Sequence, residues 1–66
     1  MAVIKVIELM ASSKKSWEDA TAKAVKKASK SISGIKSAYV QDQSVVVKNG
    51  EVSEYRVNLK VTFEVK

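Results

Sequence analysis

The last stretch of the chain alternates apolar and polar residues without a break. Every second residue is apolar, and the residues between them carry charged, amide or hydroxyl side chains. The apolar members are Tyr55, Val57, Leu59, Val61, Phe63 and Val65. A period of two is the period of a β-strand that buries one face. We therefore predict a strand over residues 54–66, at the centre of a small antiparallel sheet, with its apolar side as the floor of the core.

A second apolar segment, residues 2–10, predicts the first strand of the chain. It is free of proline and rich in residues that favour strands, namely Val3, Ile4, Val6, Ile7 and Leu9. Lys5 and Glu8 fall on opposite faces of this strand, so neither face is purely polar. We expect one face to pack on the core of the chain and the other to contact a neighbouring subunit.

Residues 11–15 predict a loop, and Ser16 then has the features of a helix N-cap. The Ser16 hydroxyl can accept from the amide at the third helical position, and Asp19 can reach back to the Ser16 amide. We expect the helix to continue to about Ile32 and Gly34 to end it in a left-handed conformation.

One face of the predicted helix is apolar but carries small side chains. Ala20, Ala24 and Ala28 recur at a spacing of four, so the helix can lie close to a sheet while burying little area. Trp17, the single tryptophan, stands at the start of this stripe. Two interpretations are open: a plug that covers one end of the core, which we favour, and a ring that stacks on a planar ligand.

Residues 35–48 predict a long second strand whose middle, residues 41–44, is polar. A bulge or bend there would let the strand change the face that it buries. The polar side chains are either ligand contacts or a solvated bend, and the sequence slightly favours the bend. Asn49-Gly50 follows, which is the strongest short hairpin signal, and it joins the second strand to the third.

The element order is strand, helix, strand, hairpin, strand, which predicts a single α+β domain over residues 1–66. The first and second strands are connected through a helix and should run parallel. The simplest sheet is three-stranded, with the third strand central and antiparallel to both neighbours. A right-handed crossover then places the helix on the apolar side of the third strand.

The composition limits the chemistry that this chain can perform. A domain of 66 residues buries only about 60% of its unfolded surface, and its stability is marginal. The absence of Cys and His removes disulfides, thiolate metal sites, the commonest zinc ligand and the commonest general base. We expect oligomerisation to supply the missing stability, and we expect no enzymatic activity. No apolar run is long enough to span a bilayer, and a cytoplasmic location is the default expectation.

The formal net charge of +5 suggests nucleic acid as a possible partner. The exposed side of the predicted helix carries Lys23, Lys26, Lys27 and Lys30. The lysines are nevertheless spread over the whole chain, with acidic residues interleaved near both ends. We therefore favour general solubility over nucleic-acid binding.

Three segments together resemble the dodecin family. They are Lys5–Glu8, Ser16–Ala20 and Tyr55–Val65, and the resemblance extends over nearly the whole chain. It implies a β-α-β-β protomer whose sheet partly wraps around the helix, and a hollow shell of twelve protomers. It also implies binding, storage or sequestration of a flavin (riboflavin, FMN or lumichrome) without turnover.

The resemblance also implies a flavin site between subunits, with one departure. Flavin-binding dodecins stack a tryptophan on the isoalloxazine ring, and the matching position here is Ser37. An acid of the second strand matches Asp42, and a glutamine that touches the flavin aligns with Arg56. We expect a weakened flavin site built from Ser37, Asp42, Gln43 and Arg56. Ser37 and Gln43 are expected to lie on one face of the second strand.

Two alternatives to flavin remain open: a calcium-type, ion-binding dodecin and a purely structural shell. The obvious oxygen donors for an ion are Asp42, Glu51, Glu54 and Glu64. Their spacing does not resemble a calcium loop, and the sequence therefore predicts no defined metal site.

Overall fold

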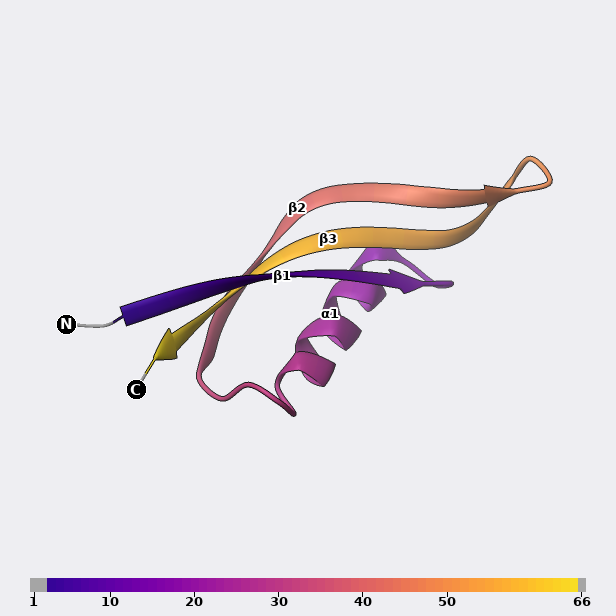
Figure 1. Cartoon of the computed structure of the whole chain (residues 1–66). Coiled ribbons are helices and arrows are strands. Elements are labelled where there is room, and N and C mark those ends of the chain that lie inside the picture. The colour runs from indigo at the N-terminus through magenta and orange to yellow at the C-terminus, as the bar shows by residue number, and fades with distance from the viewer. Residues whose placement is uncertain (1–2, 66) are drawn as a thin grey trace.

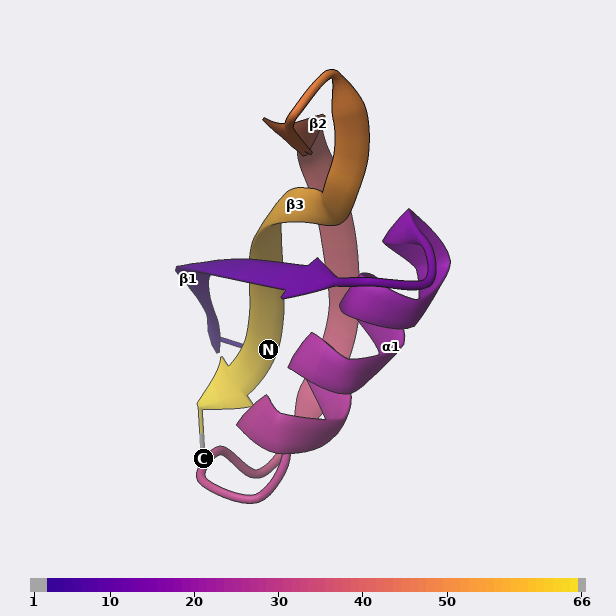
Figure 2. The same ribbon diagram turned by 90° about the vertical axis from the view of Figure 1, so that its right-hand side faces the viewer.

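A computed structural model describes residues 3–65. The elements are β1 (Val3–Ser13), α1 (Trp17–Ala28), β2 (Ile35–Lys48) and β3 (Glu51–Val65), as Figure 1 shows. The sheet order is β1-β3-β2, and both outer strands run antiparallel to β3. The helix lies against one face of this sheet (Figure 2). The predicted β-α-β-β topology with a central third strand is confirmed.

The core lies between α1 and the apolar side of β3, as the alternating pattern predicted. Val57, Leu59 and Val61 of β3 are buried together with Ala20 of the helix. Partly buried side chains surround them: Ile7, Leu9, Ala11, Trp17, Ala24, Ile35 and Ala38. Full burial of a Val or Leu side chain contributes about 1.5–3 kcal/mol, and among residues 3–65 only Val57, Leu59 and Val61 contribute in this way. The core is therefore small even for a chain of this length.

Three predicted boundaries were wrong. Strand β3 begins at Glu51 rather than at residue 54, because its pairing with β2 continues to the Lys48–Glu51 pair. Strand β1 extends three residues beyond Met10, because its pairing with β3 continues to the Ser13–Tyr55 pair. The helix ends at Ala28 rather than near Ile32, and the Ser29 hydroxyl donates to the Val25 carbonyl at this end. Serine side chains that bond nearby backbone compete with helix propagation, and the segment after Ala28 is rich in serine. The predicted strand ends at residues 2 and 66 lie outside the described residues.

Gly34 has the predicted left-handed conformation, with φ +77°, but it lies in the connection to β2 and not at the helix end. A Cβ at this position would stand 3.3 Å from the carbonyl oxygen of Glu64. The Gly34 carbonyl also accepts from the Glu64 amide at 3.0 Å. Glycine is therefore required here both by its φ angle and by the close approach of β3.

The polar middle of β2 contains the predicted irregularity. The pairing register with β3 shifts between Val40 and Asp42, so Gln41 is the extra residue of a bulge. At the hairpin, Asn49 and Gly50 both have positive φ angles, 53° and 78°, as a type I′ turn requires. Both predictions are confirmed.

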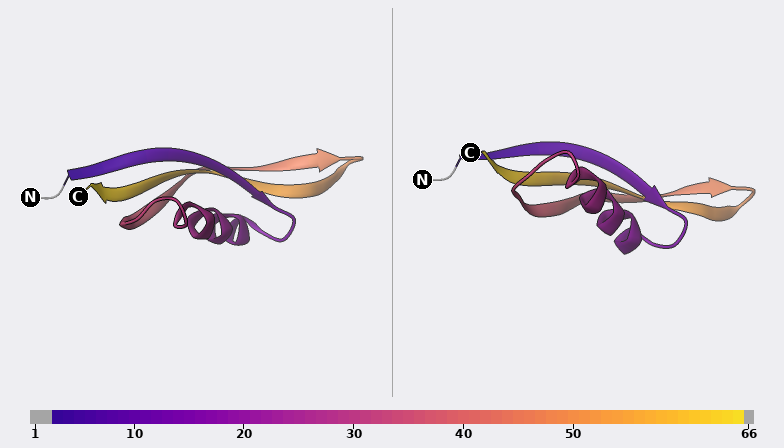
Figure 3. Two further views of the ribbon diagram at one scale, coloured as in Figure 1. Left: turned by 60° about the horizontal axis from the view of Figure 1, so that its bottom comes forward. Right: turned by 90° about the horizontal axis from the view of Figure 1, so that it is seen from below.

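The β2–β3 hairpin extends well beyond the rest of the chain. The pairing of β1 with β3 ends at Tyr55, so residues 51–54 pair with β2 alone. Figure 3 shows this hairpin projecting past the helix, and the molecule measures 51 × 19 × 13 Å along its principal axes.

Candidate ligand site on the uncovered face of the sheet

The face of the sheet opposite the helix, here called the outer face, is not covered by any element among residues 3–65. Directly paired residues of antiparallel strands point to the same face, so the registers define its rows. In the order β1, β3, β2 the rows are Val6–Thr62–Ser37, Glu8–Lys60–Tyr39, Met10–Asn58–Asp42 and Ser12–Arg56–Ser44. The outer face therefore carries both polar groups and large exposed apolar side chains.

Ser37 lies in the first of these rows, beside Thr62. The two hydroxyl groups are in hydrogen-bond contact, and the Thr62 hydroxyl also lies 3.4 Å from the Ser37 carbonyl oxygen. Ser37 is thus an exposed, locally bonded hydroxyl with no ring that could stack on a ligand.

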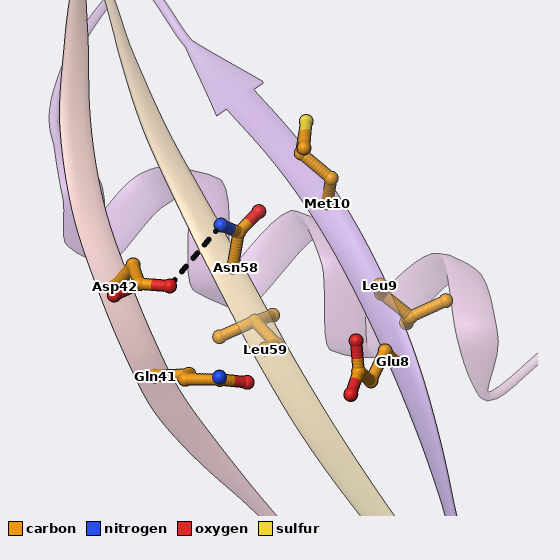
Figure 4. A pocket seen from close by; sticks show the side chains of 7 residues that line it. All are labelled: Glu8, Leu9, Met10, Gln41, Asp42, Asn58 and Leu59. Atoms are coloured by element: carbon orange, nitrogen blue, oxygen red, sulfur yellow. Dashed lines mark hydrogen bonds between the residues drawn. The ribbon is translucent and has the colours of Figure 1, made fainter.

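Asp42 lies on the same face as Ser37, two rows away. The Asn58 amide donates to the Asp42 carboxylate at 3.4 Å, a long bond between two exposed groups. Both residues line an open hollow of about 370 Å³ (Figure 4). Its lining is Glu8, Leu9, Met10, Gln41, Asp42, Asn58 and Leu59. The hollow thus brings together two carboxylates and two side-chain amides, from all three strands.

Arg56 also belongs to the outer face, where it is half-buried between Ser12 and Ser44. Gln43 does not, because it pairs with Val57, which points toward the helix. The prediction that Ser37 and Gln43 share one face is therefore wrong. The bulge at Gln41 shifts the alternation by one residue, so side chains before and after it change faces.

Sequence reasoning missed Glu8 and Tyr39 as members of this face. Tyr39 is 61% exposed and lies in the row between Ser37 and Asp42. The strand period of β2 could have placed Tyr39 beside Ser37. Glu8 could be placed only through the β1–β3 register, which pairs it with Lys60.

Trp17 lies on the other side of the sheet and takes no part in this face. Its ring packs on the core and meets Tyr55 edge-on, with centroids 5.2 Å apart and an interplanar angle of 79°. The indole N–H donates to the Ser44 carbonyl at 2.9 Å. The interpretation of Trp17 as a plug is confirmed.

Residues 3–65 contain no group of three or more Asp, Glu, His or Cys residues that could hold a metal ion. Within a single protomer the hollow supplies only two carboxylates. In the same range of residues, no helix has the length and apolar character needed to cross a membrane.

The sequence and the fold of this chain are similar to those of dodecins from three organisms. The chain is 38% identical to calcium dodecin from Mycobacterium tuberculosis, over all of this chain and 93% of the relative. The crystal structure of that calcium-chelating protein superposes with a TM-score of 0.84, covering 97% of this chain and 91% of the other. A dodecin variant from Thermus thermophilus shares 27% identity, with a TM-score of 0.93, covering 100% of this chain and 98% of that one.

Dodecin from Streptomyces coelicolor has the same fold, with a TM-score of 0.94 at 23% identity, over 98% of this chain and 93% of the other. The family model described as Dodecin matches residues 3–66. Both the sequence match and the β-α-β-β architecture extend over essentially the whole chain, which therefore belongs to the dodecin family.

Proposed function

We propose that this chain is the protomer of a dodecin-type homododecameric shell that binds a small ligand and performs no catalysis. The observation that carries the assembly is the apolar character of the uncovered surface. Ile4, Val6, Met10 and Tyr39 are at least half exposed on the outer face. Residues 3–65 contain four buried apolar side chains, and a chain with so small a core and this much exposed apolar surface is expected to bury that surface against copies of itself.

The mass of the protein in solution tests the assembly. A dodecamer has a mass of about 86 kDa, twelve times the 7.2 kDa of the chain. We expect native mass spectrometry and light scattering at micromolar concentration to give this value. A monomer or dimer mass would contradict the proposal.

The ligand that the outer face supports best is a hard divalent cation such as calcium. Calcium takes six to eight oxygen ligands, and the hollow offers the Glu8 and Asp42 carboxylates and the side-chain oxygens of Gln41 and Asn58. A relative at 38% identity is a calcium dodecin, which supports this choice. Because one protomer supplies two carboxylates, further ligands would come from water or from a second copy.

Calorimetric titration of the assembled protein with calcium, with magnesium as competitor, tests this ligand. We expect saturable calcium binding that Asp42→Asn weakens at least tenfold. Glu18→Gln removes an exposed carboxylate from the first turn of α1, away from the hollow, and is the matched control. Equal calcium binding by both variants would place the site elsewhere.

Flavin is the second candidate, and Tyr39 is the observation that favours it. Ser37 provides no stacking surface, but the exposed Tyr39 ring lies between Ser37 and Asp42 on the same face. Aromatic stacking contributes about 0.5–1.5 kcal/mol beyond the burial of area. Arg56 on this face could pair with the phosphate of FMN through charge-assisted hydrogen bonds.

Flavin fluorescence distinguishes the two candidates. If flavin is the ligand, riboflavin fluorescence is quenched by the wild type, less by Tyr39→Ala, and to the wild-type extent by Tyr39→Phe. If the wild type binds FMN more tightly than riboflavin, and Arg56→Gln loses this preference, then Arg56 binds the phosphate of FMN. Absence of quenching at micromolar protein would leave the cation as the ligand.

A further inference from the structure

The turn of the β2–β3 hairpin stands at the end of a ribbon that has only two strands. Strand β1 pairs with β3 only as far as Tyr55, so residues 47–52, here called the hairpin tip, pair only with one another (Figure 3). An isolated two-stranded hairpin is at best marginally stable in water. We therefore expect the hairpin tip to open at a lower free-energy cost than the three-stranded part of the sheet.

The two residues of the turn, Asn49 and Gly50, give this opening a chemical consequence. Asparagine is one of the thermolabile side chains, because a backbone nitrogen can attack its amide carbon. The attack meets least hindrance when the next residue is glycine, which has no side chain beside the nitrogen. Both residues are exposed, and a Cβ placed on Gly50 would meet no atom within 4 Å. The surroundings of the Gly50 nitrogen are thus open.

We propose that Asn49 is a site of spontaneous modification, at which the Gly50 backbone nitrogen displaces the side-chain amide group as ammonia. A bond forms between the Gly50 nitrogen and Asn49 Cγ, the Cγ–Nδ2 bond breaks, and the proton of the Gly50 amide leaves with the ammonia. The product is a cyclic succinimide. Water then opens the ring at one of its two carbonyl carbons. Opening at Cγ gives aspartate, and opening at the backbone carbonyl carbon gives isoaspartate.

The native turn slows this reaction, so the stability of the hairpin tip controls its rate. Asn49 has a φ angle of 53°, in the left-handed region that a type I′ turn requires. In this conformation the Asn49 side chain and the Gly50 nitrogen lie on opposite sides of the Cα–C bond. Ring closure needs both on the same side. The turn must therefore open before the ring can close.

The two products have different effects on the hairpin. Asp-Gly suits a type I′ turn as Asn-Gly does, so aspartate preserves the turn and adds a negative charge. Isoaspartate routes the main chain through the side-chain methylene and lengthens it by one atom. The connection between the paired residues Lys48 and Glu51 then loses its type I′ geometry. Either product lowers the formal net charge of +5 by one.

Peptide mass spectrometry of the incubated wild-type protein tests the proposal. The protein is kept folded at mildly alkaline pH, which favours loss of the Gly50 amide proton, and is compared with a sample that was not incubated. We expect the fragment that contains Asn49 to gain one unit of mass with time, and enzymatic methylation of isoaspartate to label it.

Asn58, the other asparagine of the chain, is the internal control. It is paired on both sides in the sheet, is followed by the buried Leu59 and donates to Asp42. We expect its conversion to be at least tenfold slower than that of Asn49. No conversion of Asn49, or equal conversion of the two asparagines, would overturn the proposal.

A pair of valine variants tests the control by the hairpin tip. Val47 and Val52 are directly paired and exposed, so Val47→Ala weakens the tip without leaving a cavity. We expect it to convert Asn49 about two- to fivefold faster, as the loss of one cross-strand pair predicts. Val3→Ala disrupts another exposed valine pair, with Val65 at the opposite end of the sheet, and should leave the rate unchanged. Equal rates in Val47→Ala and Val3→Ala would overturn the role of the hairpin tip.

Discussion

The hydroxyl of Ser13, at the end of β1, donates a hydrogen bond to the carboxylate of Asp19 in the first turn of α1. The same hydroxyl accepts from the Lys15 amide at 2.9 Å, and the Ser16 hydroxyl accepts from the Asp19 amide at 3.0 Å. Asp19 was predicted to reach back to the Ser16 amide, but its carboxylate instead bonds Ser13 and pairs with Lys23. Ser13 thus fixes the entry of the helix relative to the strand before it.

The first prediction follows from the burial of Ser13, which is only 7% exposed. Ser13→Ala removes a donor to Asp19 and an acceptor for the Lys15 amide. We expect the free energy of unfolding to fall by about 1–2 kcal/mol, as for the loss of partly buried hydrogen bonds. Ser12→Ala, at the exposed neighbouring position, should change it by less than about 0.5 kcal/mol. Chemical denaturation of both variants measures the difference.

A second prediction concerns acid. The Ser13 hydrogen bond, and then the Lys23 ion pair, hold the pKa of Asp19 below its ordinary value of 3.8. Because the folded state has the lower pKa, the stabilisation is fully present above pH 3.8 and is lost as the pH falls below it. We expect Asp19→Asn to be less stable than the wild type at about pH 6, with the difference shrinking toward about pH 2. A difference that is independent of pH would contradict this role for Asp19.

NMR titration of the carboxyl carbon checks the cause of that pKa. We expect the pKa of Asp19 to rise toward 3.8 in Ser13→Ala, and to rise less in Lys23→Gln, since the Ser13 hydrogen bond is the larger cause.

The sequence was sufficient to predict the fold, because alternation and turn chemistry act locally. The period of residues 55–65 identified the buried side of β3, and Asn49-Gly50 identified the hairpin. The site was harder to predict. The position of Gln43 depends on a one-residue bulge whose location in the polar segment 41–44 no local signal fixes, and that bulge moved Gln43 to the helix side. Glu8 joined the site only through the register of two strands distant in sequence.

Trp17 provides the third prediction, which separates a core role from a ligand role. Trp17→Phe keeps a ring against Tyr55 but loses the hydrogen bond to the Ser44 carbonyl, and we expect a loss of about 1 kcal/mol. Trp17→Ala also leaves a cavity, and we expect about 3 kcal/mol. Thermal unfolding measures both. Calcium and flavin binding by folded Trp17→Phe should equal that of the wild type; a change of tenfold or more would contradict the assignment of Trp17 to the core.

The last prediction tests the outer face as the place where a planar ligand would bind. Ser37 stands where flavin-binding dodecins are expected to carry a tryptophan, and it lies on the open face beside Thr62. An indole at this exposed position meets no buried neighbour within its own protomer, so Ser37→Trp should fold, and light scattering checks that it still assembles. It would place a ring next to Tyr39 and supply the missing stacking surface, about 0.5–1.5 kcal/mol for each aromatic contact.

We expect riboflavin and FMN to bind Ser37→Trp at least several-fold more tightly than the wild type in a fluorescence titration. Val40→Trp is the control: Val40 is exposed but pairs with the buried Leu59, so the ring would lie on the helix side of the sheet and should bring no such gain. If Ser37→Trp binds flavin no more tightly than the wild type, the flavin site does not lie on this face.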